Sequence, residues 1–205
     1  MNGMQFMNKV LALKSSIMGK QSQTNALIDY FLAERKAKGC NDEVRERDLV
    51  TLGLPVLDEE LFHALRGAPP SNDRTHAIVR LSDELIAELK ESDLVVIGAP
   101  MYNLNVPTQL KNWFDLVARA GVTFRYTETY PEGLVEGVRA VVISPRGGVH
   151  AGQETDAVTP YLNAVLGLIG ITEVSFVYAE GLDMRPHGRD KGLADARSRL
   201  AALAA

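Results

Sequence analysis

The chain has 205 residues, of which 46% are hydrophobic and 23% are charged, and its net charge is −4. This composition is typical of one soluble globular domain and excludes a disordered chain, a collagen-like fibre and a repeat array. The sequence contains no run of Lys and Arg that indicates a nucleic-acid site, and no apolar stretch near the ~18 residues of a membrane span. The first residues do not have the pattern of a signal peptide. We therefore expect a cytoplasmic protein with a short extension at 1–6 and a single domain at 7–205.

In the first half of the chain, short apolar runs alternate with segments of helical period. Residues 10–13 predict a strand, and the following helix is predicted to begin after Ser22 and to end before Gly39. The highly charged segment 44–50 predicts a strand at the edge of a sheet. Residues 52–70 show no clear period, and 78–92 predict a second helix.

The second half of the chain continues the same alternation. Residues 93–100 are almost continuously apolar, as expected of a strand that is covered on both faces. Pro107 is predicted to be the first residue of a helix, because a helix does not use the N–H group at that position. A polar, aromatic segment then precedes a strand at 140–144, a helix that ends at 169, a strand at 174–178 and a terminal helix.

This alternation predicts an α/β fold of the flavodoxin-like type. The expected architecture is a three-layer sandwich with a five-stranded parallel sheet in the order 2-1-3-4-5 and helices on both faces. In such sheets, ligands bind at the carboxyl ends of the strands, where the strand order reverses. The loops after strands 1, 3 and 4 are therefore the places in which to look for a site.

The loop after the first strand is rich in hydroxyl groups and leads directly into a helix. It has neither the Walker pattern nor the glycine pattern of a dinucleotide turn. The first turn of a helix offers unpaired N–H groups and a partial positive charge, which favour one compact phosphate. The candidate residues are Ser16, Ser22, Gln23 and Thr24. Simple helix capping by Ser22 explains the same pattern equally well.

The loops after the third and fourth strands predict contacts with a planar ring. The loop after the third strand combines apolar and aromatic side chains with an amide. Its candidate residues are Pro100, Met101, Tyr102, Asn103 and Leu104. Such a set suits a flat heteroaromatic ligand, although Met101 and Leu104 could simply cover the core.

In the loop after the fourth strand, the candidates are Pro145, Arg146, Gly147 and Gly148. The two glycines let the main chain approach a ligand and present N–H groups to it, and Arg146 could add positive charge. An ordinary Gly-Gly turn with a surface arginine is the alternative. Together the three loops describe a ligand with a phosphate at one end and a planar ring at the other, which is the shape of FMN.

At this point the sequence resembles a known family. The segments that carry the resemblance are IGAPMYNLNVPTQLKNWFDLVARAGVTFRYTE, PEGLVEG, SPRGGVH, VTPYLNAVLGLIGI and YAEG. They are similar to the FMN-dependent NADH-azoreductases, also described as FMN-dependent NADH:quinone oxidoreductases, and the similarity extends from Met7 onward. It implies a homodimer with one FMN per subunit and active sites at the subunit interface. The family's flavin contacts fall on the candidate residues of the three loops, with Leu104 in place of a frequent Phe. Pro145 departs from the family's Ser and can offer neither a hydroxyl nor an N–H group.

The resemblance also implies the activity. NADH or NADPH gives a hydride to the flavin and leaves, and the acceptor, a quinone or an azo compound, then takes the same place in a ping-pong cycle. The flavin supplies the chemistry, so no nucleophile or catalytic triad is required. No catalytic residue is certain: His150 and Tyr126 are candidates for proton delivery, and Phe124 for an aromatic wall contributed across the dimer. Arg66 is a candidate contact for the anionic nicotinamide cofactor. Each of these residues also has an ordinary structural interpretation.

Two other functions fit the same sheet. A flavodoxin-type electron carrier would bind FMN without a small-molecule substrate, but such carriers are usually shorter and strongly acidic. A receiver-like signalling domain needs clustered acidic residues for Mg²⁺, and Lys14, Ser15, Pro100 and Met101 occupy those places. We expect no metal site, since His63, His76 and His187 lack ligand spacing, and we expect Cys40 to be a solvated bystander.

Overall fold

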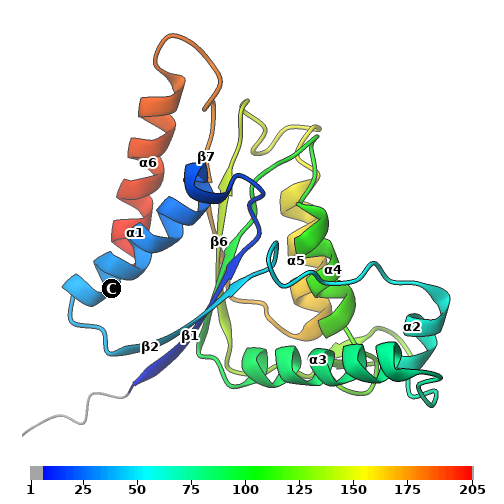
Figure 1. The fold of residues 1–205 in the computed structure, drawn as a ribbon. Coiled ribbons are helices and arrows are strands. Elements are labelled where there is room, and N and C mark those ends of the chain that lie inside the picture. Colours follow the sequence, from blue (N-terminus) through cyan, green and yellow to red (C-terminus); the bar gives the residue numbers. More distant parts are fainter. Residues whose placement is uncertain (1–6, 205) are drawn as a thin grey trace, which may run out of the picture.

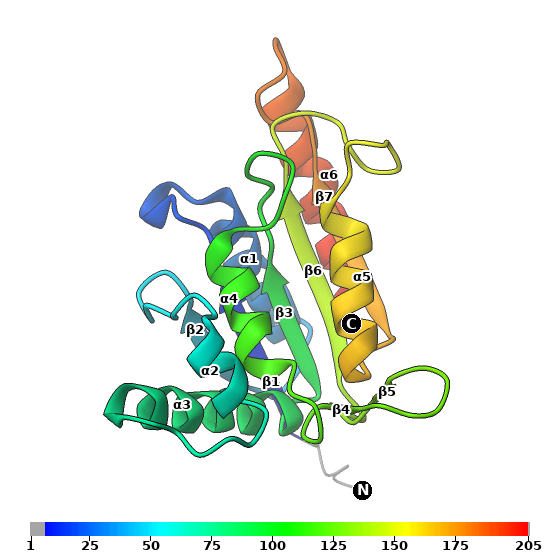
Figure 2. The same cartoon turned by 90° about the vertical axis from the view of Figure 1, so that its right-hand side faces the viewer.

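A computed structural model of the chain describes residues 7–204, which form three layers (Figures 1 and 2). The central layer is a parallel sheet whose strands follow the order β2-β1-β3-β6-β7. These strands are β1 (Asn8–Lys14), β2 (Asp42–Asp48), β3 (Leu94–Gly98), β6 (Arg139–Pro145) and β7 (Val174–Ala179). The predicted order 2-1-3-4-5 is confirmed, because β6 and β7 are the fourth and fifth strands of this sheet. The short strands β4 (Phe124–Arg125) and β5 (Glu132–Gly133) form a separate antiparallel pair.

Helices cover both faces of the sheet. On one face lie α1 (Gln23–Ala37) and α6 (Gly188–Leu203), which run side by side (Figure 1). On the other face lie α3 (Asp73–Lys90), α4 (Thr108–Val117) and α5 (Val158–Ile169), and a short helix, α2 (Glu59–Ala64), packs against α3 (Figure 2). A single 3-10 turn, Gly19–Gln21, precedes α1. Within residues 7–204, no helix combines the length and the apolar character needed to cross a bilayer.

The sheet has a separate apolar core on each face, because successive side chains of a strand point to opposite faces. In β1, Leu11 and Leu13 belong to the core under α3, α4 and α5, whereas Val10 and Ala12 belong to the core under α1 and α6. All five residues of β3 are buried, as the continuous apolar run predicts.

The charged strand β2 lies at the edge of the sheet, as its composition predicts, but it begins at Asp42 and ends at Asp48. Asp42 accepts two hydrogen bonds from the Arg35 guanidinium, at 2.6 and 2.8 Å, and so ties the end of α1 to this edge. The hydrogen bond from Arg35, working against burial, holds the pKa of Asp42 below its usual value.

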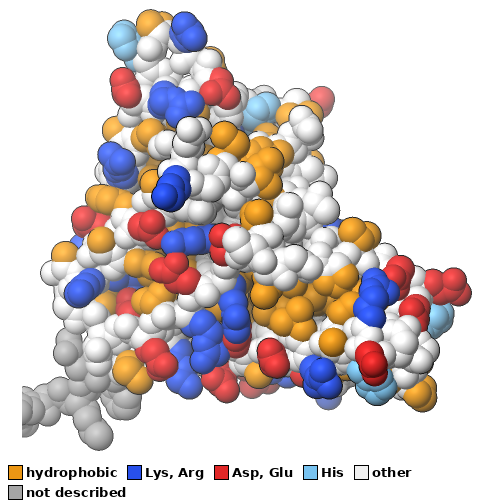
Figure 3. All heavy atoms as spheres, viewed as in Figure 1, with side chains coloured by type: hydrophobic (Ala, Val, Ile, Leu, Met, Phe, Trp, Pro, Cys, Tyr) orange, Lys and Arg blue, Asp and Glu red, His pale blue; other side chains and the backbone are white. Residues whose placement is uncertain are grey.

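Two details differ from the sequence predictions. Pro107 is the N-cap residue of α4 and not its first helical residue, because the helix begins at Thr108. Residues 52–70, predicted to be irregular, contain α2, whose N-cap Asp58 accepts a hydrogen bond from the N–H of Leu61 at 2.8 Å. On the surface, acidic and basic side chains are interspersed over the face shown in Figure 3, without a continuous basic area on that face.

Candidate functional site

A cavity of about 550 Å³ lies at the carboxyl ends of β1, β3 and β6, as the topology predicts. Nine of the thirteen residues expected to contact the cofactor line it: Ser16, Gln23, Thr24, Pro100, Met101, Tyr102, Pro145, Arg146 and Gly147. The other four, Ser22, Asn103, Leu104 and Gly148, adjoin these residues in the chain but do not line the cavity. The sheet therefore brings the three predicted loops together at one place.

At one end of the cavity lies the first turn of α1. The buried Ser22 is the N-cap, and its hydroxyl accepts a hydrogen bond from the N–H of Asn25 at 3.0 Å. The capping interpretation of Ser22 is therefore confirmed. The helical hydrogen bonds begin with the N–H of Ala26, so the N–H groups of Gln23 and Thr24 remain available to a ligand.

Close packing holds this turn in place. The α1 helix lies directly against β3 at Gly98, where a Cβ atom would be 2.7 Å from Cγ2 of Thr24 and 2.9 Å from Cδ1 of Ile28. The carbonyl of Gly98 also accepts a hydrogen bond from the buried Ser15 hydroxyl at 2.5 Å. The lack of a side chain at Gly98 thus allows the N-terminus of α1 to pack closely against the sheet.

Hydrogen bonds join the three loops to one another. The hydroxyl groups of Ser16 and Tyr102 are 3.0 Å apart, which links the loop after β1 to the loop after β3. The N–H of Met101 donates to the carbonyl of Pro145 at 3.0 Å, which links the loop after β3 to the loop after β6. Pro145 thus uses its carbonyl within the protein, and packing is its main remaining contribution to a ligand.

A tight turn follows Tyr102. The backbone groups of Tyr102 and Asn105 exchange two hydrogen bonds, at 2.9 and 3.0 Å, around Asn103 and Leu104. Both central residues have left-handed backbones, with φ of 49° at Asn103 and 66° at Leu104. Asn tolerates this conformation, whereas an exposed Leu in it is strained. Such strain is often found beside ligand sites.

The loop after β6 offers main-chain donors at the other end of the cavity. The backbone N–H of Arg146 donates a hydrogen bond to the carbonyl of Ala179. The carbonyl of Gly147 accepts from the N–H of Asp183, and that of Gly148 accepts from the N–H of Gly181. Among the described residues, no acceptor is found for the N–H groups of Gly147 and Gly148. The N–H group of Gly147, which lines the cavity, therefore fits the predicted role of the Gly-Gly pair, whereas Gly148 only adjoins the cavity.

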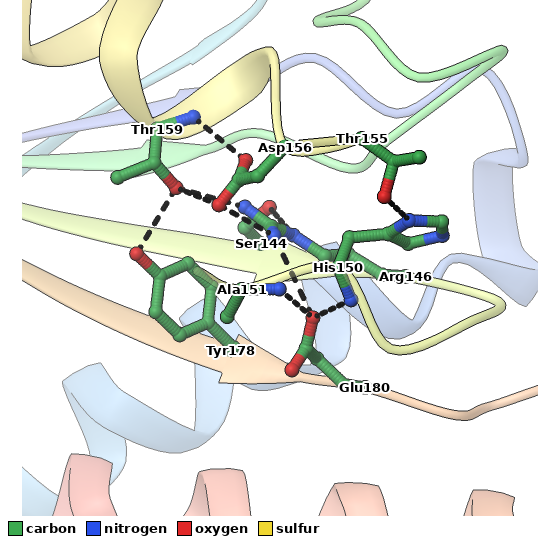
Figure 4. Close-up of polar contacts among 9 residues, drawn as sticks. All are labelled: Ser144, Arg146, His150, Ala151, Thr155, Asp156, Thr159, Tyr178 and Glu180. Carbon is green, nitrogen blue, oxygen red and sulfur yellow. Dashed lines mark hydrogen bonds and ion pairs between the residues drawn. The ribbon is translucent and has the colours of Figure 1, made fainter. Parts of the chain in front are cut away.

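The guanidinium of Arg146 does not face a ligand, contrary to the sequence prediction that it adds charge to the site. It is fully buried, 3.0 Å from Asp156 and 3.5 Å from Glu180, and it stacks on the ring of Tyr178 (Figure 4). It also donates to the hydroxyls of Ser144 and Thr159, at 3.2 and 3.0 Å. The charge of Arg146 is therefore neutralised within the protein.

This cluster supports the glycine loop. One carboxylate oxygen of Glu180 accepts hydrogen bonds from the N–H groups of His150 and Ala151, both at 2.7 Å (Figure 4). Burial would raise the pKa of Asp156, but hydrogen bonds from Arg146 and from Thr159 hold it below the usual value. The loop is thus anchored by its contacts with Glu180 and by the ion pair of Arg146 with Asp156.

His150 lies beside the cavity and does not line it. Its Nδ1 is 2.8 Å from the Thr155 hydroxyl, and its Nε2 is 2.8 Å from the position that a Cβ atom on Gly148 would occupy. A proton role for His150 stays a prediction.

The remaining candidates lie elsewhere, around a separate cavity of about 270 Å³ between α2 and the end of α4. Phe124 is buried there and packs edge-to-face against Tyr126, with ring centroids 5.4 Å apart. The Arg66 guanidinium stacks on Phe62 at 4.3 Å and is 3.5 Å from the Tyr126 hydroxyl. Within one chain, Phe124 is therefore a supporting core residue, and Tyr126 presents the exposed ring.

Five lining residues were not predicted: Met18, Gln21, Leu182, Asp183 and Arg189. The last three come from the segment after β7, whose carboxyl end lies at the same edge of the sheet. The rule that ligands bind at the carboxyl ends of parallel strands could also have identified the segment after β7. Among the described residues, no cluster of His, Cys, Asp and Glu side chains could hold a metal ion.

Comparisons with known proteins agree with this architecture. Residues 8–204 match the model of the family described as having a flavodoxin-like fold. The chain is 71% identical to FMN-dependent NADH:quinone oxidoreductase 4 of Burkholderia lata, over 96% of this chain and 99% of that protein. It is 61% identical to the FMN-dependent NADH:quinone oxidoreductase of Aeromonas salmonicida, over 97% and 100% of the two chains.

A solved structure is similar over nearly the whole length. The crystal structure of azoreductase from Bacillus anthracis str. Sterne has a TM-score of 0.87 and 28% identity, and the match covers 97% of this chain and 99% of that one. The fold, the cavity and these relatives together show that the chain belongs to the family of FMN-dependent NADH:quinone oxidoreductases, which have the flavodoxin-like fold.

Proposed function

We propose that this chain binds one FMN per subunit and transfers two electrons from NADH or NADPH to quinones, and that it also reductively cleaves azo compounds. We further propose a ping-pong order, in which the oxidised nicotinamide leaves before the acceptor binds. Membership of the family supports the enzyme class and the cofactor. The order of binding and the range of acceptors are our own proposals.

One observation carries the proposal: N–H groups without acceptors lie at both ends of a single cavity. Among the described residues, Gln23 and Thr24 offer such groups at the start of α1, and Gly147 offers one in the loop after β6. A phosphate suits the helix N-terminus, and the polar edge of a flavin suits the glycine loop. The residues present therefore fit FMN.

The protein's part in the reaction is to bind and orient. Met101 and Tyr102 provide packing for a planar ring, and Ser16 holds the Tyr102 hydroxyl at 3.0 Å. When bound, FMN would supply the redox chemistry, which is the transfer of two electrons from the nicotinamide to the acceptor. In this proposal, the N–H group of Gly147 would stabilise negative charge at the ring edge.

The separate cavity beside Tyr126 favours a homodimer. The separate cavity is lined by Arg66, Phe124 and Tyr126, none of which lines the main cavity of the same chain. The exposed rings of Phe62 and Tyr126, which line this separate cavity, suit a contact with another molecule. We propose that a second copy brings these residues to the substrate side of the flavin.

Steady-state oxidation of NADH with benzoquinone, in the absence of any other protein, tests the function. We expect sustained turnover and parallel double-reciprocal lines at several fixed benzoquinone concentrations. Intersecting lines would exclude the ping-pong order. Flavin binding without turnover would instead favour an electron carrier of the flavodoxin type.

Sedimentation at micromolar concentration tests the dimer. The mass should be about twice 22.4 kDa, and Tyr126→Leu should reduce turnover while FMN binding remains. The matched control is Tyr130→Leu, which removes a more exposed ring outside both cavities. A fully active monomer would contradict the shared site.

A further inference from the structure

Backbone hydrogen bonds hold the segment between β7 and α6 against the glycine loop that follows β6. Residues 180–187 connect the two elements beyond the carboxyl end of the sheet (Figure 1). The N–H of Leu182 donates to the carbonyl of Arg146 at 3.1 Å. The N–H of Asp183 donates to the carbonyl of Gly147 at 3.0 Å. The segment therefore lies at the end of the main cavity that we propose for the flavin ring, the ring end.

Two side chains of opposite charge lie at the ring end. Oδ2 of Asp183 is 2.5 Å from the position that a Cβ atom on Gly147 would occupy, so the carboxylate lies directly beside this glycine. Nη2 of Arg189 is 3.3 Å from Oδ1 of Asp183. Both residues line the cavity, although the side chains of Arg189 and Asp183 are 53% and 78% exposed. The ion pair thus borders the ring end and is in contact with solvent.

Close packing of α6 fixes the backbone of Arg189 at this place. A Cβ atom on Gly188 would overlap the carbonyl oxygen of Gly181. A Cβ atom on Gly192 would overlap the carbonyl oxygen of Glu180. The two helix glycines therefore allow the start of α6 to lie directly against the segment after β7, and Arg189 lies between them in the chain.

The charges that line the cavity nearly cancel. Among the described residues, the charged lining residues are Arg146, Asp183 and Arg189. The Arg146 guanidinium is fully buried and is neutralised by its own carboxylate partners. The electrostatic potential beside Gly147 therefore depends mainly on Asp183 and Arg189. Removal of either charge would change the net charge at the ring end by one unit.

Such a change matters because the reaction moves charge into the cavity. Hydride transfer from a reduced nicotinamide delivers two electrons and one proton, and the nicotinamide leaves as a positively charged ring. One negative charge therefore remains in the cavity until a second proton arrives. A nearby cation stabilises this charge and a nearby anion opposes it, and charges near the ring nitrogens are known to tune a flavin.

We propose that Arg189 and Asp183 set the reduction potential of the bound flavin in opposite directions. This inference rests on the proposed FMN site. Arg189 raises the potential, because its positive charge favours the extra negative charge at the ring end. Asp183 lowers the potential from its place beside Gly147. Both residues act through their electric field and need no direct contact with the ring.

Equilibration of the FMN-loaded full chain with a reference dye of known potential tests the proposal, since absorbance gives the ratio of reduced to oxidised flavin. We expect Arg189→Ala to shift this equilibrium about fivefold toward oxidised flavin, which corresponds to about 20 mV for two electrons. Asp183→Asn should shift it by a similar factor toward reduced flavin. The double variant, in which neither charge is present, should resemble the wild type.

Two further variants separate charge from structure. Arg189→Lys keeps the positive charge and should keep the wild-type potential. Lys191→Ala removes a positive charge from the same helical turn outside the cavity, where it lies 3.8 Å from Asp195, and should leave the potential unchanged.

An unchanged potential in Arg189→Ala would overturn the inference while leaving the proposed function intact. Shifts of the same sign in Arg189→Ala and Asp183→Asn would also overturn it, because they would indicate a structural disturbance. A wild-type chain that does not bind FMN would overturn both the inference and the proposed function.

Discussion

The Arg146 guanidinium is completely buried and lies 3.0 Å from the carboxylate of Asp156, whose side chain is only 6% exposed. The two residues belong to different elements: Arg146 follows β6, and Asp156 precedes α5. Their contact fixes the loop that carries Gly147, Gly148 and His150. The arginine of the glycine loop thus acts on the site through the backbone that it holds.

Arg146→Met should strongly destabilise the protein. It leaves the buried Asp156 and the half-buried Glu180 without their cation, and removing one partner of a buried ion pair costs about 3–5 kcal/mol. Urea unfolding of the flavin-free chain measures this loss. Lys111→Ala, which removes an exposed partner of Asp115, should cost less than about 1 kcal/mol. Equal losses in the two variants would show that the Arg146 cluster is not the anchor described.

Stability should depend on the ionisation of Asp156 in acid. The pKa of this carboxyl is below its unfolded value of 3.8, so its contribution is complete above pH 3.8 and is lost as the pH falls through the folded pKa. The difference in free energy of unfolding between the wild type and Asp156→Asn should therefore be constant at pH 5–7 and narrow below pH 3.8. A difference that grows in acid would contradict the assigned direction.

Gly98→Ala should move the start of α1. The new Cβ atom would be 2.7 Å from Thr24 and 3.2 Å from the carbonyl of Leu13, and overpacking of this kind costs about 1–3 kcal/mol. We expect a matching loss in the free energy of unfolding and weaker binding of FMN. The control is Gly167→Ala in α5, where a Cβ meets nothing within 4 Å and helix propensity should improve. Unchanged FMN affinity in Gly98→Ala would contradict the claim that the packing of α1 against Gly98 positions the phosphate end of the site.

Leu104→Gly should relieve backbone strain beside the cavity. With φ of 66°, Leu104 has a conformation that glycine adopts freely, so the variant should gain about 0.5–1 kcal/mol in free energy of unfolding. Val149→Gly is the control, because Val149 is exposed but does not have a positive φ, and it should lose stability instead. A loss of stability in Leu104→Gly would mean that contacts of the leucine outweigh its strain.

Much of the fold follows from local patterns in the sequence. The continuous apolar run at β3 identifies a central strand, and the charges of β2 identify an edge strand, because burial differs so clearly between the two positions. Helix α2 could not be predicted in this way, because its six residues are too few to show a helical period of apolar side chains.

The site is predictable where it depends on strand ends, and unpredictable where it depends on distant partners. Ser16, Met101 and Gly147 follow strands, so topology alone brings them together. The role of Arg146 depends on Asp156 and Glu180, which approach it only through the packing of α5 and the pairing of β6 with β7. No local pattern distinguishes such a buried arginine from one that faces a ligand.

The central claim is that the cavity at the carboxyl ends of β1, β3 and β6 binds a flavin mononucleotide. Equilibrium titration of the purified, flavin-free chain with FMN, with FAD in parallel, tests it most directly. We expect one FMN per chain and much weaker binding of FAD, because a cavity suited to a terminal phosphate has no place for the added AMP. A chain that remains colourless after incubation with FMN and desalting would contradict the account.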